Sequence, residues 1–116
     1  MTGYVFYPTA DAAQDRIWSD TVEHWGEAQA ATYIKGLHAH LERLSKTPVL
    51  WRRLPNGLTA PTSFSSETYF SRYERNYVFF RKLPSGKIGV VSILHERMDL
   101  PARLFEDLTR LLNGDA

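Results

Sequence analysis

The sequence of 116 residues contains no cysteine. This absence excludes disulfide bonds and thiolate metal sites, and it fits a reducing cytoplasm. No apolar run approaches the roughly 18 residues that a membrane-spanning helix requires. The N-terminal stretch MTGYVFYPTA lacks the basic and then apolar pattern of a signal peptide. We therefore expect a soluble, cytoplasmic protein that makes no contact with a membrane.

Sequence signatures of several enzyme classes are missing as well. The chain has no glycine-rich loop of the kind that binds phosphates, and no pair of carboxylates at the spacing of metal ligands. His38 and His40 are two residues apart on an expected helix. Their side chains would point about 200° apart, so they cannot bind one metal ion together. We expect no metal site and no cofactor.

The net charge of the chain is only +1, but the charges are unevenly distributed. Residues 1–42 contain two basic and six acidic side chains, and residues 98–116 contain two and four. Residues 43–97 contain ten basic and three acidic side chains. This central region is either an ordinary solvated surface or a basic region that meets an acidic partner or a phosphate backbone.

Two helices are predicted in the first half of the chain. The stretch TADAAQDRIWSDTVEHW predicts a helix over residues 9–25, capped by Thr9 or Asp11 and ended by Gly26. The stretch EAQAATYIKGLHAHLERLSKTP predicts a second helix, and the short turn between them indicates an antiparallel helical hairpin. Apolar side chains at helical spacing form one face of each helix. They are Ile17, Trp18, Val22 and Trp25 in the first helix, and Ala30, Ile34, Leu37, Leu41 and Leu44 in the second.

We expect Trp18 and Trp25 to lie in the core of this hairpin rather than in a ligand-binding cage. Residues 49–66 follow, with two prolines and a glycine, and predict a long loop that contains at most one short strand.

The period of the sequence changes after this loop. The runs ETYFSRY, YVFFRK and KIGVVSIL are rich in β-branched and aromatic residues, and they predict an antiparallel meander. VFYP near the N-terminus predicts an additional edge strand, and DLPARLFEDLTRLL predicts a C-terminal helix. The predicted fold is therefore α+β, a single domain over residues 1–116. In it the N-terminal helical hairpin packs on a small antiparallel sheet and the C-terminal helix lies nearby.

One face of so small a sheet is expected to remain partly open and to bind a partner. Aromatic and basic residues of the meander are the candidates for this face, although the sequence leaves their register open. They are Tyr69, Arg72, Tyr73, Tyr77, Phe79 and Arg81.

The hairpin sequence resembles that of a known family. The pattern is carried by Ile17, Trp18, Trp25, Gly26, Gln29, Ala30, Tyr33, Leu37, Leu41, Leu44 and Pro48. YVFFR and VVSILHERMD follow downstream. Their order and spacing resemble the RelE/ParE superfamily of toxins, and ParE more than RelE. The more specific part is WGEAQAATYIKGL, and the similarity extends from about Ala10 to Leu104.

The resemblance implies the toxin of a type II toxin–antitoxin system, of the kind that stabilises plasmids. Such a toxin is neutralised by a cognate antitoxin that folds around it in a hetero-oligomer. ParE members act on DNA gyrase, whereas RelE members cut mRNA in the ribosome. The resemblance therefore favours inhibition of gyrase by binding, with a ribosome-dependent mRNA endonuclease as the alternative and a toxin-like protein without toxicity as the third hypothesis.

The endonuclease alternative requires an acid, a base and cations at the scissile phosphate. His95 is the candidate acid or base, and Arg81 and Arg97 are the candidate cations. Side chains alternate along a strand, so His95 and Arg97 share a face if the strand continues that far. We favour instead a structural role for His95 at the end of a strand, and a binding function without catalytic residues.

The residues that we expect to contact the antitoxin or the target are basic and aromatic. Arg52 and Arg53 stand beside Trp51 on the long loop, and an acidic segment of the antitoxin is expected to pair with the arginines of the meander. The full set is Arg52, Arg53, Arg72, Tyr73, Arg75, Tyr77, Phe79 and Arg81.

Overall fold

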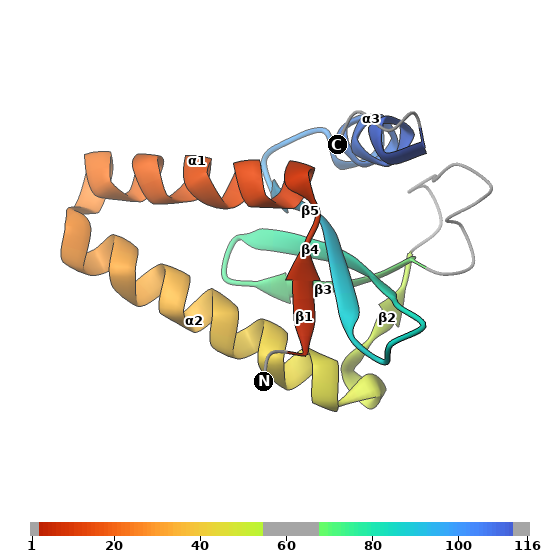
Figure 1. Cartoon of the computed structure of the whole chain (residues 1–116). Helices are drawn as coiled ribbons and strands as arrows, with labels where there is room; N and C mark the ends of the chain where they lie inside the picture. The colour runs from red at the N-terminus through yellow and green to blue at the C-terminus, as the bar shows by residue number, and fades with distance from the viewer. Residues whose placement is uncertain (1–2, 55–67, 113–116) are drawn as a thin grey trace.

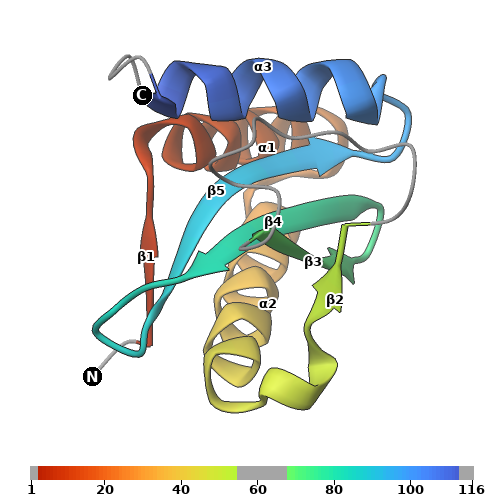
Figure 2. The ribbon, with the colours of Figure 1, turned by 90° about the vertical axis from the view of Figure 1, so that its right-hand side faces the viewer.

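The structure is a computed structural model, which describes residues 3–54 and 68–112. Helices α1 (Pro8–Trp25) and α2 (Glu27–Lys46) form a hairpin that covers one face of a five-stranded sheet (Figure 1). Helix α3 (Leu100–Leu112) lies against the opposite face, as the rotated view shows (Figure 2). The predicted α+β architecture is confirmed.

The strands lie in the order β1-β5-β4-β3-β2. Strands β3 (Thr68–Tyr73), β4 (Asn76–Lys82) and β5 (Ile88–His95) form the predicted antiparallel meander. The predicted edge strand is β1 (Tyr4–Phe6), which runs parallel to β5 and makes the sheet mixed rather than purely antiparallel. It pairs there because β5 is the last strand of the meander and its outer edge is free.

The segment after α2 contains the short strand that the sequence allowed. A 3-10 turn at Pro48–Leu50 leads into β2 (Arg52–Arg53), which pairs antiparallel with β3. Of the expected long loop 49–66, residues 55–66 lie outside the part of the chain that the structure describes.

The two hairpin helices are joined by a single residue, Gly26, with φ of +91° and ψ of 167°. Only glycine adopts this conformation readily, so the sharp reversal requires it.

The first helix begins one residue earlier than predicted, because Pro8 supplies a helical φ at the first position. Capping by Thr9 or Asp11 is therefore wrong: Tyr7 occupies the cap position and its side chain forms no capping hydrogen bond.

Two apolar clusters lie on the two sides of the sheet. Between the sheet and the hairpin, Leu37 and Leu41 of α2 pack against Val78 and Phe80 of β4. On the other side, Leu104 and Leu108 of α3 pack against the second cluster, which also contains Phe79, Val91 and Leu94. The six candidate residues of the open face are therefore divided by the register of the sheet. Tyr69 and Tyr73 face the hairpin, whereas Arg72, Tyr77, Phe79 and Arg81 face the α3 side.

The two tryptophans of α1 are not core residues, and that prediction is wrong. Trp25 is 75% exposed and Trp18 is 39% exposed. The buried positions of α1 are the small residues Ala10 and Ala13, which let the helix lie close to its neighbours. Within the described ranges, no helix combines the length and apolarity needed to cross a membrane.

Candidate partner-binding cleft

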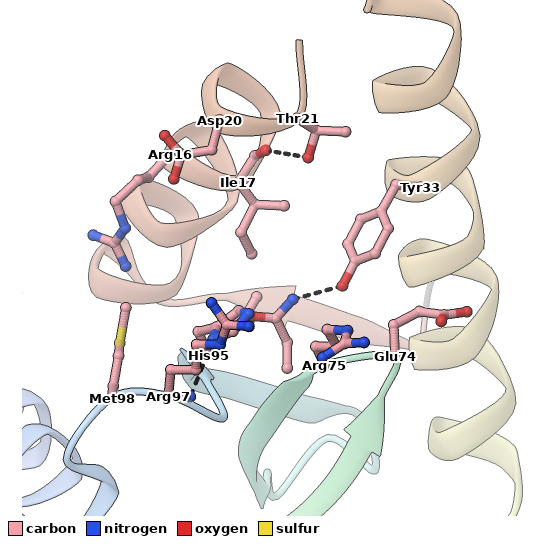
Figure 3. Close-up of a pocket in the computed structure, with 12 residues that line it drawn as sticks. Arg16, Ile17, Asp20, Thr21, Tyr33, Glu74, Arg75, His95, Arg97 and Met98 are labelled. Carbon is pink, nitrogen blue, oxygen red and sulfur yellow. Dashed lines mark hydrogen bonds between the residues drawn. The ribbon is translucent and has the colours of Figure 1, made fainter. Parts of the chain in front are cut away.

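A cleft of about 500 Å³ opens between the helical hairpin and the end of the sheet where β3 turns into β4 and β5 ends (Figure 3). We call it the hairpin–sheet cleft. Its lining combines apolar side chains with charged ones from both halves of the chain. The lining residues are Arg16, Ile17, Asp20, Thr21, Tyr33, Glu74, Arg75, Asn76, Ile93, His95, Arg97 and Met98.

Helix α1 supplies one wall of this cleft. Arg16 and Asp20 are one turn apart and exposed, so both charges are available to a ligand. Ile17 is half-buried, and its carbonyl oxygen accepts a hydrogen bond of 2.7 Å from the Thr21 hydroxyl. This bond satisfies the hydroxyl within the helix and leaves the two charged groups as the polar contacts of the wall.

The opposite wall is held by Tyr33 of α2. The Asn76 amide donates a hydrogen bond to the Tyr33 hydroxyl oxygen, and the Tyr73 hydroxyl donates to the Tyr33 carbonyl at 3.3 Å. The two tyrosine rings meet edge to face at 5.2 Å. Burial raises the pKa of Tyr33 above its ordinary value, against the opposing effect of the Asn76 hydrogen bond. Tyr33 is therefore a neutral hydroxyl at physiological pH and a poor base.

His95 is the last residue of β5 and lies directly opposite Asn76 of β4. Its Nδ1 atom accepts a hydrogen bond of 3.1 Å from the backbone N–H of Arg97. That bond places the proton of the neutral ring on Nε2. The structure thus brings His95 and Arg97 together at one cleft, although the strand ends before Arg97.

Arg81 is not part of this group. It pairs with Gly89 and Thr68 in the sheet, five residues along β4 from Asn76, which is roughly 17 Å at the rise of a strand. It also lies on the same face as Phe79, which packs against the α3 side. The predicted endonuclease trio of His95, Arg81 and Arg97 is therefore not assembled in the structure.

Two of the predicted partner-binding arginines are tied to a carboxylate of the chain itself. Glu96 forms ion pairs with Arg72 at 2.7 Å and with Arg75 at 3.2 Å. The Arg72 guanidinium also lies 5.8 Å from the centre of the Tyr77 ring, and its Nε atom donates to the Glu74 carbonyl. Because both arginines are more than half exposed, these pairs contribute little stability. An acidic partner can therefore replace Glu96 at small cost.

The remaining predicted contact residues are dispersed. Phe79 is fully buried and unavailable to a partner, and Tyr73 faces the hairpin. Arg52 and Arg53 are exposed on β2, with Arg53 6.0 Å from the centre of the Tyr69 ring. Trp51, by contrast, packs against the core and donates its indole N–H to the Leu44 carbonyl at 2.7 Å. Of the expected basic and aromatic cluster on the loop, only the two arginines are therefore exposed, and the tryptophan is part of the packing against the core.

The sequence reasoning missed Arg16 and Tyr33. Arg16 is the one Lys or Arg residue of α1 and directly precedes Ile17 of the apolar face. A cation at the edge of an apolar helix face is a sequence pattern from which the position of Arg16 beside a cleft could have been predicted. Tyr33 gave no such signal, because its role depends on Asn76, which is 43 residues away.

The other histidines have structural partners. His38 bonds the Tyr4 hydroxyl at 2.6 Å as well as Gln14, and it stacks on Phe6. His40 bonds the Ser71 hydroxyl at 2.9 Å. In the described part of the chain, no three His, Cys, Asp or Glu side chains gather as metal ligands.

Comparison with known proteins gives one consistent result. Residues 4–100 match the family model described as "ParE toxin of type II toxin-antitoxin system, parDE". Toxin ParE of Escherichia coli is 33% identical over 112 residues, which cover 93% of this chain and 98% of that protein. Toxin ParE1 of Mycobacterium tuberculosis is 29% identical over 101 residues, which cover 87% and 96%. Toxin ParE1 of Caulobacter vibrioides is 26% identical over 104 residues, which cover 90% and 99%. The chain belongs to the ParE family of toxins of type II toxin–antitoxin systems.

Proposed function

We propose that this ParE-family toxin inhibits DNA gyrase by binding, without catalysis of its own, and that its cognate antitoxin neutralises it through the hairpin–sheet cleft. The composition of the cleft is the observation that supports its assignment as the antitoxin-binding site. Arg16 and Arg97 line it, and neither forms an ion pair with any described residue. Arginine clusters of this kind recognise acidic segments of partner proteins.

The floor of the cleft suits the same ligand. Ile17, Ile93 and Met98 provide apolar contacts in the same lining as the arginines. An antitoxin segment that alternates apolar and acidic side chains would bury the first against this floor and pair the second with the guanidinium groups. The apolar contacts supply affinity, and the charges supply orientation and a fast approach.

Gyrase binding is favoured over RNA cleavage by the geometry around His95. A general base needs an unprotonated nitrogen within reach of the substrate hydroxyl. The Nδ1 atom of His95 already accepts the Arg97 N–H, and Arg81 lies on the other face of the sheet. The resemblance to ParE rather than RelE points to the same target.

The endonuclease alternative is retained because of one observation. Arg16, Arg75 and Arg97 line the same cleft as His95, and a protonated His95 could serve there as a general acid. The two hypotheses differ in what they require of this histidine.

The test compares the wild type with His95→Ala and with a control, His24→Ala. The control removes an exposed histidine that lies on α1, outside the cleft. Each protein is assayed for inhibition of supercoiling by purified gyrase, for cleavage of ribosome-bound mRNA and for growth arrest on expression. We expect all three proteins to inhibit supercoiling and to arrest growth. Cleavage of mRNA by the wild type with gyrase unaffected, lost in His95→Ala, would establish the endonuclease instead. Expression without any growth defect would favour a protein that only binds.

A further inference from the structure

The exposed side of helix α1 carries an aromatic and acidic surface that the cleft does not use, and its two tryptophans lie toward the closed end of the hairpin. Asp11, Asp15, Trp18, Val22 and Trp25 follow one another at intervals of four and three residues, so they lie along one stripe of α1. We call this set the tryptophan stripe. None of its residues lines the hairpin–sheet cleft. In Figure 1 the hairpin turn lies at the end of the molecule farthest from the strands.

The exposure of this stripe is not explained by folding. Trp25 is 75% exposed and Trp18 is 39% exposed, whereas the buried residues of α1 are Ala10 and Ala13. Tryptophan is the side chain that most often provides the central contact of a protein interface, because it buries a large area with little loss of conformational entropy. Trp18 and Trp25 are one heptad apart and together form an exposed surface that a binding partner can cover.

The stripe is also held rigidly. The backbone N–H of Gly26 donates to the Val22 carbonyl at 2.9 Å, and the N–H of Ala30 donates to the Gly26 carbonyl at 3.1 Å. These bonds link the last turn of α1 to the first turn of α2. A preorganised surface loses less entropy on binding than a flexible one.

Charge identifies the kind of partner. Helix α1 has four acidic side chains and one arginine, and Arg16 lines the cleft together with one of the acids, Asp20. Asp11 and Asp15 belong to the stripe itself, and within the described residues neither forms an ion pair. Such a surface repels phosphate backbones and anionic lipids. It also repels a second copy of itself, because a twofold contact places the same acids opposite one another.

We propose that the tryptophan stripe docks an arginine-bearing face of the protein that the toxin attacks. Guanidinium groups stack on the indole rings of Trp18 and Trp25, and they pair with the carboxylates of Asp11 and Asp15. The acidic antitoxin segment that suits the cleft is repelled from the stripe, so the two surfaces select different partners. This inference rests on the proposed function, in which the attacked protein is gyrase.

The test uses Trp18→Ala, Trp25→Ala and Asp15→Lys in the full chain. The control is Phe105→Ala, which removes an aromatic side chain that is 46% exposed on α3. Supercoiling by purified gyrase is titrated with each variant, and the affinity for the cognate antitoxin is measured by calorimetry. We expect each stripe variant to need a concentration about tenfold higher for half-inhibition, with antitoxin affinity within about twofold of the wild type. The control changes neither value.

The outcomes separate the two proposals. If the wild type inhibits gyrase and the stripe variants inhibit it equally well, the docking assignment is overturned and the proposed function stands. If the stripe variants lose antitoxin affinity instead, the occupant is the antitoxin and the assignment is again wrong. A wild type that does not inhibit gyrase overturns both. Circular dichroism confirms that each variant is folded, and Asp15→Lys decides the matter should an alanine variant unfold.

Discussion

The hairpin–sheet cleft and the tryptophan stripe share helix α1, yet they differ in shape, exposure and composition. Arg16 and Trp18 are two residues apart, so their side chains point about 200° apart around α1. The cleft is concave and includes Arg16 and Arg97, which form no ion pair with a described residue, whereas the stripe is exposed, aromatic and acidic. One helix can therefore contribute different side chains to two surfaces, because its period separates the residues that line the cleft from those of the stripe.

The largest effect we predict concerns stability, and it tests whether the stripe is surface or core. Leu41 is fully buried against the sheet, so Leu41→Ala should lower the free energy of unfolding by about 2–5 kcal/mol. Trp25→Ala should change it by less than about 0.5 kcal/mol, because most of the side chain is already in water. Urea unfolding monitored by circular dichroism measures both. Equal losses in the two variants would place Trp25 in the core and remove the contrast between core and stripe.

The second prediction tests the charge of the cleft. The double variant Arg16→Glu, Arg97→Glu should weaken antitoxin binding about 100-fold, because each new carboxylate repels the acidic segment. Inhibition of gyrase should change little. Lys35→Glu, Lys46→Glu is the matched control, since it makes the same change of charge on α2, outside the cleft. Calorimetry in low and moderate salt measures the affinities. Equal weakening in both double variants would mean that net charge, and not the cleft, governs the interaction.

The smallest effects concern the two turns that shape these surfaces. Gly26→Ala should lower the free energy of unfolding by about 1–3 kcal/mol, because φ of +91° is strained for alanine although no atom obstructs its methyl group. Glu74 at the edge of the cleft has φ of +53°, so Glu74→Gly should raise the free energy of unfolding by up to about 1 kcal/mol. Thermal unfolding measures the two changes, which should have opposite signs. A loss of stability in Glu74→Gly would show that its backbone is not strained.

The elements of the fold could be predicted because their signals are local. Apolar side chains recur at helical spacing in α1 and α2, and alternation with β-branched residues predicts the meander. The division of the sheet faces could not be predicted in the same way. It depends on the two-residue turn Glu74–Arg75, which pairs Tyr73 with Asn76. The run ETYFSRY predicts the end of β3 at Tyr73 correctly, but the turn has neither glycine nor asparagine, so the sequence does not indicate its type or the register that it sets.

The site was only partly predictable, for a related reason. His95 and Arg97 were found because both lie at the end of an apolar run. The ion pairs of Glu96 with Arg72 and Arg75 join residues more than 20 positions apart and leave no periodic signal. The tryptophans were wrongly assigned to the core because apolar periodicity identifies only an apolar helix face. It does not show whether that face packs against the same chain or against another protein.

The pairing of β1 with β5 determines the order in which this toxin can fold. Tyr4 lies opposite Ile88 and Phe6 opposite Val90, so the first strand has no partner until the fifth has been synthesised. Contacts between such distant positions close a long loop and form slowly. The β5 strand also ends in His95, which lines the cleft. During translation, the nascent chain therefore has neither a completed sheet nor a complete hairpin–sheet cleft until its last strand has left the ribosome.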